Sequence, residues 1–124
     1  MAGSKNILIV EDDVMIRDMY KAALEAAGYK VGIAGKATEA YKLLESFKPD
    51  CILLDVMLPE TSGLEILNEL RKNPKLGCQN TKIIMMTNLA EKEIRDKAIE
   101  GGVDGYVIKS DIVPKDLLKI VPSL

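Results

Sequence analysis

Five short apolar segments, separated by longer segments with helical spacing, limit what this 124-residue chain can fold into. Each apolar segment has only four or five residues and favours Val, Ile and Leu, which is typical of strands buried on both faces. We expect strands from Asn6 to Val10, Lys30 to Ala34, Cys51 to Leu54, Lys82 to Met86 and Gly105 to Ile108. Apolar strands that alternate with helices predict a parallel sheet covered on both sides.

The segments between the strands place apolar residues at the spacing of helices. The expected helices run from Ile16 to Ala27, Ala40 to Phe47, Ser62 to Leu70, Asn88 to Gly101 and Pro114 to Val121. Ser62 and Glu65 fit a capping box at the start of the third helix. Asn88, followed by Glu91, is expected to cap the fourth helix, and Pro122 is expected to stop the last. Right-handed crossovers leave few topologies, so we expect a doubly wound α/β fold with five helices and the flavodoxin-like strand order 2-1-3-4-5.

Length and charge narrow the class of protein. We expect a single domain over residues 1–124, with residues 1–4 as a possible cloning remnant. The formal net charge of −2 gives no electrostatic reason to bind nucleic acid or an anionic membrane directly. The chain shows no secretory signal or membrane-spanning run, and two cysteines make no disulfide framework, so we expect a cytoplasmic protein. Cys51 is expected to be buried, whereas Cys78 lies in a polar loop and is expected to be an exposed thiol.

The chain contains no histidine. This absence excludes Ser-His and Cys-His nucleophile pairs, histidine-rich metal sites and a phosphohistidine relay within this chain. The chemistry of the chain must therefore depend on carboxylates, hydroxyls and lysines.

Polar side chains gather where the predicted strands end. They are Glu11, Asp12 and Asp13 after the first strand, Asp55 after the third, Thr87 after the fourth and Lys109 after the fifth. The carboxyl ends of parallel strands share one rim, where ligands bind. Clustered carboxylates repel one another unless a cation lies among them, and hard oxygen ligands suit Mg²⁺. A carboxylate can also attack phosphorus to give an aspartyl phosphate, while an ammonium and a hydroxyl hold the phosphoryl oxygens.

At these residues the chain resembles the receiver domain of two-component response regulators, of the chemotaxis-regulator type, over essentially its full length. The matching segments are ILIVEDD at 7–13, LLDVMLPETSG at 53–63, IIMMT at 83–87 and DGYVIK at 104–109. The spacing of Asp55, Pro59 and Gly63 is a specific signature of that family.

The resemblance implies that Asp55 accepts a phosphoryl group from a histidine kinase in a Mg²⁺-dependent reaction. The implied metal ligands are Asp12, Asp13, Asp55 and the backbone carbonyl of Met57. The residues implied to bind the phosphoryl group are Thr87 and Lys109. The implied switch residues are Thr87 and Tyr106. Glu11 is not expected to bind the metal directly. Such a domain is not an enzyme, since it assists only its own phosphorylation and dephosphorylation.

The resemblance also implies partners. These are a sensor histidine kinase and either a downstream protein target or a C-terminal output domain outside this chain. Phosphorylation is expected to reshape the face formed by the fourth helix, fifth strand and fifth helix, through which a homodimer could also form.

Three departures from the family pattern stand out. Ser110 replaces the usual Pro after Lys109, so the Lys109–Ser110 bond is expected to be trans, because only X-Pro bonds become cis at small cost. Asn88 is larger than the usual small residue and could restrict access to Asp55. The final helix is short; either the natural chain continues, or the receiver stands alone.

Two rival interpretations come from other classes. A haloacid-dehalogenase-type phosphatase or phosphotransferase also forms an aspartyl phosphate, but Met57 stands where such enzymes place a second Asp. A flavodoxin-like flavin carrier needs a phosphate-binding loop after the first strand, where Glu11, Asp12 and Asp13 would repel phosphate.

Overall fold

The computed structural model describes residues 5–89 and 91–121 and contains one parallel five-stranded sheet. Its strands are β1 (Asn6–Val10), β2 (Lys30–Ala34), β3 (Cys51–Asp55), β4 (Lys82–Thr87) and β5 (Gly105–Ile108). Their order is β2-β1-β3-β4-β5, which confirms the predicted doubly wound topology. All neighbouring strands pair in parallel, so every strand presents its carboxyl end at the same edge of the sheet.

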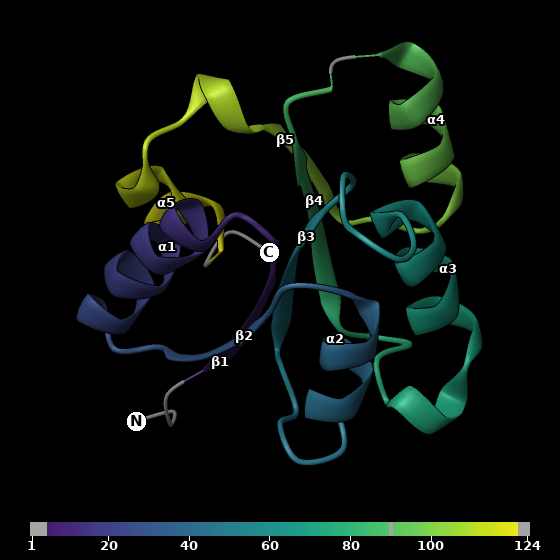
Figure 1. Cartoon of the computed structure of the whole chain (residues 1–124), viewed down its shortest axis with the longest axis horizontal. Helices are drawn as coiled ribbons and strands as arrows, with labels where there is room; N and C mark the ends of the chain where they lie inside the picture. Colours follow the sequence, from purple (N-terminus) through teal and green to yellow (C-terminus); the bar gives the residue numbers. More distant parts are fainter. Residues whose placement is uncertain (1–4, 90, 122–124) are drawn as a thin grey trace.

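Helices cover both faces of the sheet, as Figure 1 shows. Helices α1 (Val14–Ala26) and α5 (Leu117–Ile120) lie on one side, and α2 (Ala37–Leu43), α3 (Gly63–Lys72) and α4 (Lys92–Glu100) lie on the other. Short 3₁₀ helices are η1 (Pro74–Leu76), η2 (Lys109–Asp111) and η3 (Pro114–Asp116). The five predicted helices are thus present, although the last begins as a 3₁₀ turn at Pro114. The expected stop at Pro122 lies outside the described residues.

Side chains alternate along each strand between two hydrophobic cores. Ile7 and Ile9 of β1 point into the core beneath α1 and α5, whereas Leu8 and Val10 point into the core beneath α2, α3 and α4. The same alternation holds in the other central strands, because successive side chains of a strand face opposite sides. This period of two decides on which side each residue at the strand ends lies.

The starts of α3 and α4 differ in how well the sequence predicted them. Ser62 caps α3 as expected, since its hydroxyl accepts from the backbone N–H of Glu65 at 3.4 Å. The Glu65 carboxylate, however, accepts from the Thr61 hydroxyl. The expectation for α4 was wrong: its N-cap is Glu91, without a side-chain cap bond, and the helix begins at Lys92 rather than next to Asn88.

Cys78 is buried with 1% exposure, so the expectation of an exposed thiol was wrong. Arg71 of α3 explains this burial. Its guanidinium donates to the backbone carbonyls of Cys78 at 3.1 Å and Thr81 at 2.6 Å and pairs with Asp104 at 2.8 Å, so it draws the loop after η1 against α3. Cys51 is buried as expected, and burial raises the pKa of its thiol to about 12.

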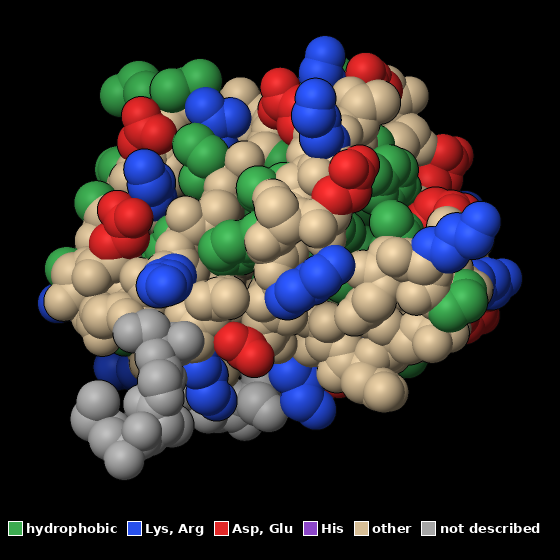
Figure 2. All heavy atoms as spheres, turned by 90° about the horizontal axis from the view of Figure 1, so that it is seen from below, with side chains coloured by type: hydrophobic (Ala, Val, Ile, Leu, Met, Phe, Trp, Pro, Cys, Tyr) green, Lys and Arg blue, Asp and Glu red, His purple; other side chains and the backbone are tan. Residues whose placement is uncertain are grey.

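The surface carries both signs of charge. Figure 2 shows lysine, arginine and acidic side chains interspersed on one face, consistent with the small net charge. Among the described helices, none is long and apolar enough to cross a membrane.

Candidate phosphorylation site

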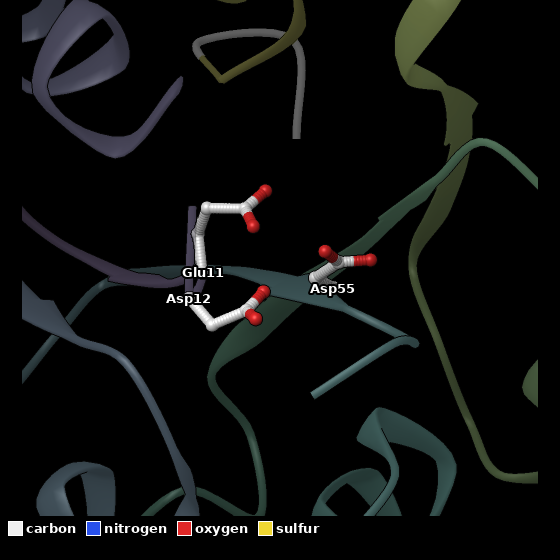
Figure 3. A group of neighbouring side chains, drawn as sticks. All are labelled: Glu11, Asp12 and Asp55. Atoms are coloured by element: carbon white, nitrogen blue, oxygen red, sulfur yellow. The ribbon is translucent and has the colours of Figure 1, made fainter. Parts of the chain in front are cut away.

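The carboxyl edge of the sheet brings together acidic residues from two neighbouring strands. Glu11 and Asp12 directly follow β1, and Asp55 is the last residue of β3. One carboxylate oxygen of each lies within 4.8 Å of the others. Figure 3 shows the side chains of Glu11 and Asp12 diverging from the end of β1, with Asp55 beside them at the end of β3.

This acidic group fits a magnesium ion. Glu11 and Asp55 are buried, whereas Asp12 is exposed, so a cation could reach the group from solvent and keep several water ligands. Carboxylates are the hard oxygen ligands that Mg²⁺ prefers, and an ion there would offset their mutual repulsion. Bound in that position, Mg²⁺ would neutralise negative charge on phosphoryl oxygens.

Lys109 bridges two of these carboxylates. Its Nζ lies 2.7 Å from Glu11 Oε1 and 2.8 Å from Asp55 Oδ2, and the side chains of the three residues are 10%, 4% and 5% exposed, respectively. Burial alone disfavours an ammonium, but the hydrogen bonds to Asp55 and Glu11 outweigh it and raise the pKa of Lys109. The site therefore holds a fixed cation next to the carboxylate expected to react.

Glu11 is held from two directions. Its Oε1 accepts from Lys109, and its Oε2 accepts from the backbone N–H of Asp13 at 3.1 Å. Burial nevertheless raises the pKa of Glu11, with the hydrogen bonds to Lys109 and Asp13 acting in the opposite direction. The charged form of Glu11 thus depends on its partners. The sequence placed Glu11 at the rim with Asp12 and Asp13 but indicated no contact with Asp55. The period-two alternation of β1, continued one residue past Val10, puts the Glu11 side chain on the same face as Asp55.

Asp13 and Met57 occupy the flanking positions. Asp13 caps α1, because its Oδ1 accepts from the N–H of Ile16 at 3.1 Å. Direct metal binding by Asp13 stays a prediction, and it would have to share or break this cap. Met57 donates its backbone N–H to Asp55 Oδ1 at 3.2 Å, so the turn after β3 is held next to the site. The role of its carbonyl also stays a prediction.

Gly63 allows this turn to close. A Cβ at position 63 would lie 2.0 Å from the backbone oxygen of Asp55, which no side chain can tolerate. The N–H of Gly63 donates to the carbonyl of Val56 at 2.9 Å, so the start of α3 packs directly on the end of β3. The spacing of eight residues between Asp55 and Gly63 therefore has a steric cause.

Thr87 lies on the opposite side of the sheet from Lys109. It is fully buried, and its hydroxyl accepts from the backbone N–H of Leu89 at 3.1 Å. The carbonyl of Leu89 in turn accepts from the Tyr106 hydroxyl at 2.8 Å. Thr87, Leu89 and Tyr106 thus form a continuous chain of hydrogen bonds, which the sequence could not reveal because it depends on how the loop after β4 folds.

The loop after β5 follows the expectation for Ser110. The described residues contain no cis peptide bond, so the Lys109–Ser110 bond is trans, as predicted. Residues Lys109–Asp111 form a 3₁₀ turn there. Asn88 is exposed, and its effect on access to Asp55 stays a prediction.

A doubly wound parallel sheet with an acidic rim and a bridging lysine defines a class of α/β domain suited to binding a cation and a phosphoryl group together. The chain belongs to the response regulator receiver domain family, whose model matches residues 7–121. Receiver domains are signalling domains that interact with histidine kinases, and their general function is phosphorylation on an aspartate. This membership favours a receiver over the two rival interpretations.

Individual relatives agree with the family. The chain is 39% identical over 114 residues to the phosphate regulon transcriptional regulatory protein PhoB of Pseudomonas aeruginosa, covering 92% of this chain and 48% of that protein. A CheY-like receiver domain protein from Methanospirillum hungatei matches with a TM-score of 0.88 and 35% identity, covering 98% of this chain and 93% of that one. A Burkholderia pseudomallei response regulator solved with a phosphorylated aspartic acid and a calcium ion matches with a TM-score of 0.81 and 28% identity, over 93% and 65% of the two chains. The chain spans about half the length of the curated relatives it matches.

Proposed function

We propose that Asp55 is the phosphoacceptor and that it receives a phosphoryl group from the phosphohistidine of a sensor histidine kinase. The observation that carries this proposal is the Lys109 ammonium held 2.8 Å from Asp55 within a buried acidic group. A carboxylate oxygen of Asp55 attacks the phosphorus atom, the phosphorus–nitrogen bond to the kinase histidine breaks, and the nitrogen keeps the electron pair of that bond.

The neighbouring residues each have a role in this transfer. Lys109 neutralises a phosphoryl oxygen, and the Thr87 hydroxyl hydrogen-bonds another, since charge-assisted hydrogen bonds are stronger than neutral ones. Asp12 and Asp55 of the acidic group, together with Asp13 and the Met57 carbonyl, are the proposed ligands of Mg²⁺, whereas Glu11 of that group holds Lys109. The domain assists its own phosphorylation and dephosphorylation and does not turn over an external substrate.

The proposed output is a change in the face formed by α4, β5 and α5. A phosphoryl group of about −1.5 to −2 charge units replaces the single negative charge of the Asp55 carboxylate, so the rim gains negative charge and acceptor oxygens. The Thr87 hydroxyl moves toward the new oxygens. The loop at Leu89 and the Tyr106 ring follow, which alters the surface offered to a downstream protein, an output domain or a second copy of the chain. A cytoplasmic location and the absence of direct nucleic-acid binding complete the proposal.

Mass spectrometry after treatment with acetyl phosphate and Mg²⁺ tests the acceptor. The wild type should gain the mass of one phosphoryl group, and Asp55→Asn should gain none. Asp18→Asn is the matched control, because Asp18 is an exposed residue of α1, and it should behave as wild type. Equal phosphorylation of Asp55→Asn and wild type would reject Asp55 as the acceptor.

A further inference from the structure

Tyr20 of α1 places a phenol next to the phosphorylation site. The residue is 6% exposed and belongs to the core beneath α1 and α5. Tyr20 lines a small cavity together with Glu11, Asp55 and four apolar residues of the central strands. The cavity measures about 10 Å³, which leaves room for no more than one water molecule. Tyr20 therefore reaches the underside of the acidic group.

The Tyr20 hydroxyl is a hydrogen-bond donor without a partner among the described residues. None of the hydrogen bonds found among residues 5–89 and 91–121 involves this hydroxyl, and the two carboxylates that share its cavity are already engaged by Lys109. Burial raises the pKa of Tyr20. The nearby charges also act on this pKa: Lys109 lowers it, whereas Glu11 and Asp55 raise it.

Phosphorylation, as proposed above, draws the Lys109 ammonium toward a phosphoryl oxygen. If Lys109 turns to a phosphoryl oxygen, Glu11 keeps only the N–H of Asp13, although its side chain is 4% exposed. A carboxylate that is only 4% exposed and loses a hydrogen-bond donor is costly unless another donor replaces it, and the cavity beside Glu11 has room for one water molecule at most. The phosphorylated state therefore needs a second donor for Glu11.

We propose that Tyr20 is this donor, a positioning residue whose hydroxyl binds the Glu11 carboxylate across their shared cavity when Lys109 turns to the phosphoryl group. The inference rests on the proposed function, because it assumes that phosphorylation draws Lys109 away from Glu11. Tyr20 touches neither the phosphorus atom nor the attacking oxygen; it stabilises the phosphorylated state through Glu11.

Binding of beryllofluoride, a mimic of the phosphoryl group, measures the effect. Tyr20→Phe keeps the ring and the packing but removes the donor, so it should bind beryllofluoride roughly fivefold to tenfold more weakly than wild type. Tyr41→Phe is the matched control: Tyr41 is a partly buried tyrosine that packs against the other core, and its loss of a hydroxyl should leave the affinity unchanged.

A double-mutant cycle separates this role from simple packing. In a Glu11→Gln background the carboxylate charge is gone, so adding Tyr20→Phe should weaken beryllofluoride binding by less than twofold. In wild type with ¹³C-labelled tyrosine, the Cζ resonance of Tyr20 should shift on adding beryllofluoride, and this shift should be lost in Glu11→Gln. The spectroscopic arm decides the question even if Tyr20→Phe fails to fold.

The outcomes distinguish the two proposals. Wild-type affinity in Tyr20→Phe, an equal loss in both backgrounds, or a Tyr20 resonance that does not respond would each overturn the role of Tyr20, while leaving Asp55 as the acceptor. Failure of the wild type to bind beryllofluoride, or binding by Asp55→Asn equal to wild type, would overturn the proposed function and the role of Tyr20 together.

Discussion

The two sides of the sheet carry different kinds of polar contact at the same rim. On the side of α1 and α5, Lys109 holds Glu11 and Asp55 in a buried ionic group. On the side of α3 and α4, the Thr87 hydroxyl, the Leu89 backbone and Tyr106 form a chain of neutral hydrogen bonds. The ionic side contains charge-assisted hydrogen bonds, which are strong. The neutral side contains neutral hydrogen bonds, whose exchange for other partners changes the free energy little.

The alternation of strand side chains produces this separation. Residues two positions apart share a face, so Asp55 continues the face of Leu53, and Lys109 continues the face of Val107, both in the core beneath α1 and α5. Tyr106 packs in the other core, and Thr87 continues the face of Met85 there. The residues that hold charge (Glu11, Asp55 and Lys109) and those proposed to respond to phosphorylation (Thr87, Leu89 and Tyr106) therefore lie on opposite faces of the sheet and meet only at the strand ends.

Lys109→Met should give the largest effect and break the ionic side alone. Without the ammonium, Glu11 and Asp55 remain as two buried carboxylates, so the free energy of unfolding in Mg²⁺-free buffer should fall by roughly 3 kcal/mol. Phosphorylation by acetyl phosphate should become too slow to detect. Chemical denaturation followed by circular dichroism measures the first effect, and mass spectrometry the second.

The same variant tests how separate the two sides are. Lys115→Met, at an exposed position, is the matched control and should match wild type in both measurements. In the unphosphorylated protein, the amide resonances of Leu89 and Tyr106 should stay near their wild-type positions in Lys109→Met. Large shifts at these two residues would show that the two sides form one network.

Thr87→Ala should break the coupling between the sides with a smaller effect on stability. The variant keeps Asp55 and Lys109, so it should still accept a phosphoryl group, but the N–H of Leu89 loses its acceptor hydroxyl. Amide NMR with and without beryllofluoride compares the responses: wild type should shift across residues 89–109, whereas Thr87→Ala should respond mainly near Asp55. Equal shifts across 89–109 in both proteins would remove Thr87 as the coupling residue.

The sequence predicted the fold well because the decisive signals are local. Apolar runs marked β1, β2 and β5 to the residue, and β3 and β4 were each one residue longer than expected. Because the strands are parallel, their ends also indicated which polar residues would lie at one rim. The resemblance to receiver domains then assigned roles to those residues.

What the sequence did not reveal depends on contacts between distant segments. Cys78 is buried because Arg71 holds its loop, a contact that leaves no local pattern. Helix α4 begins at Lys92 rather than near Asn88, after a loop in which Leu89 bonds to Thr87 and to the distant Tyr106. Tyr20 lies within the predicted first helix, but nothing near it in the sequence indicates that it lines a cavity together with Glu11.

Tyr106→Phe should give the smallest effect, because it changes only the neutral side of the sheet. The change removes only the 2.8 Å hydrogen bond to the Leu89 carbonyl and leaves the ring in the core beneath α3 and α4. The free energy of unfolding should fall by about 1 kcal/mol or less, because a neutral hydrogen bond at a partly exposed position contributes little net stability.

Tyr106→Phe should also change the response to beryllofluoride only modestly. The control is Tyr29→Phe, because Tyr29 is a partly buried tyrosine on the other side of the sheet. If the neutral side reads out phosphorylation, losing this bond should reduce the beryllofluoride-induced shift at Leu89 while leaving beryllofluoride affinity within about threefold of wild type. A tenfold loss of beryllofluoride affinity would mean that Tyr106 contributes to binding the phosphoryl group. An unchanged shift at Leu89 would mean that the hydrogen bond between Leu89 and Tyr106 carries no part of the response, and that the ring alone links β5 to the loop after β4.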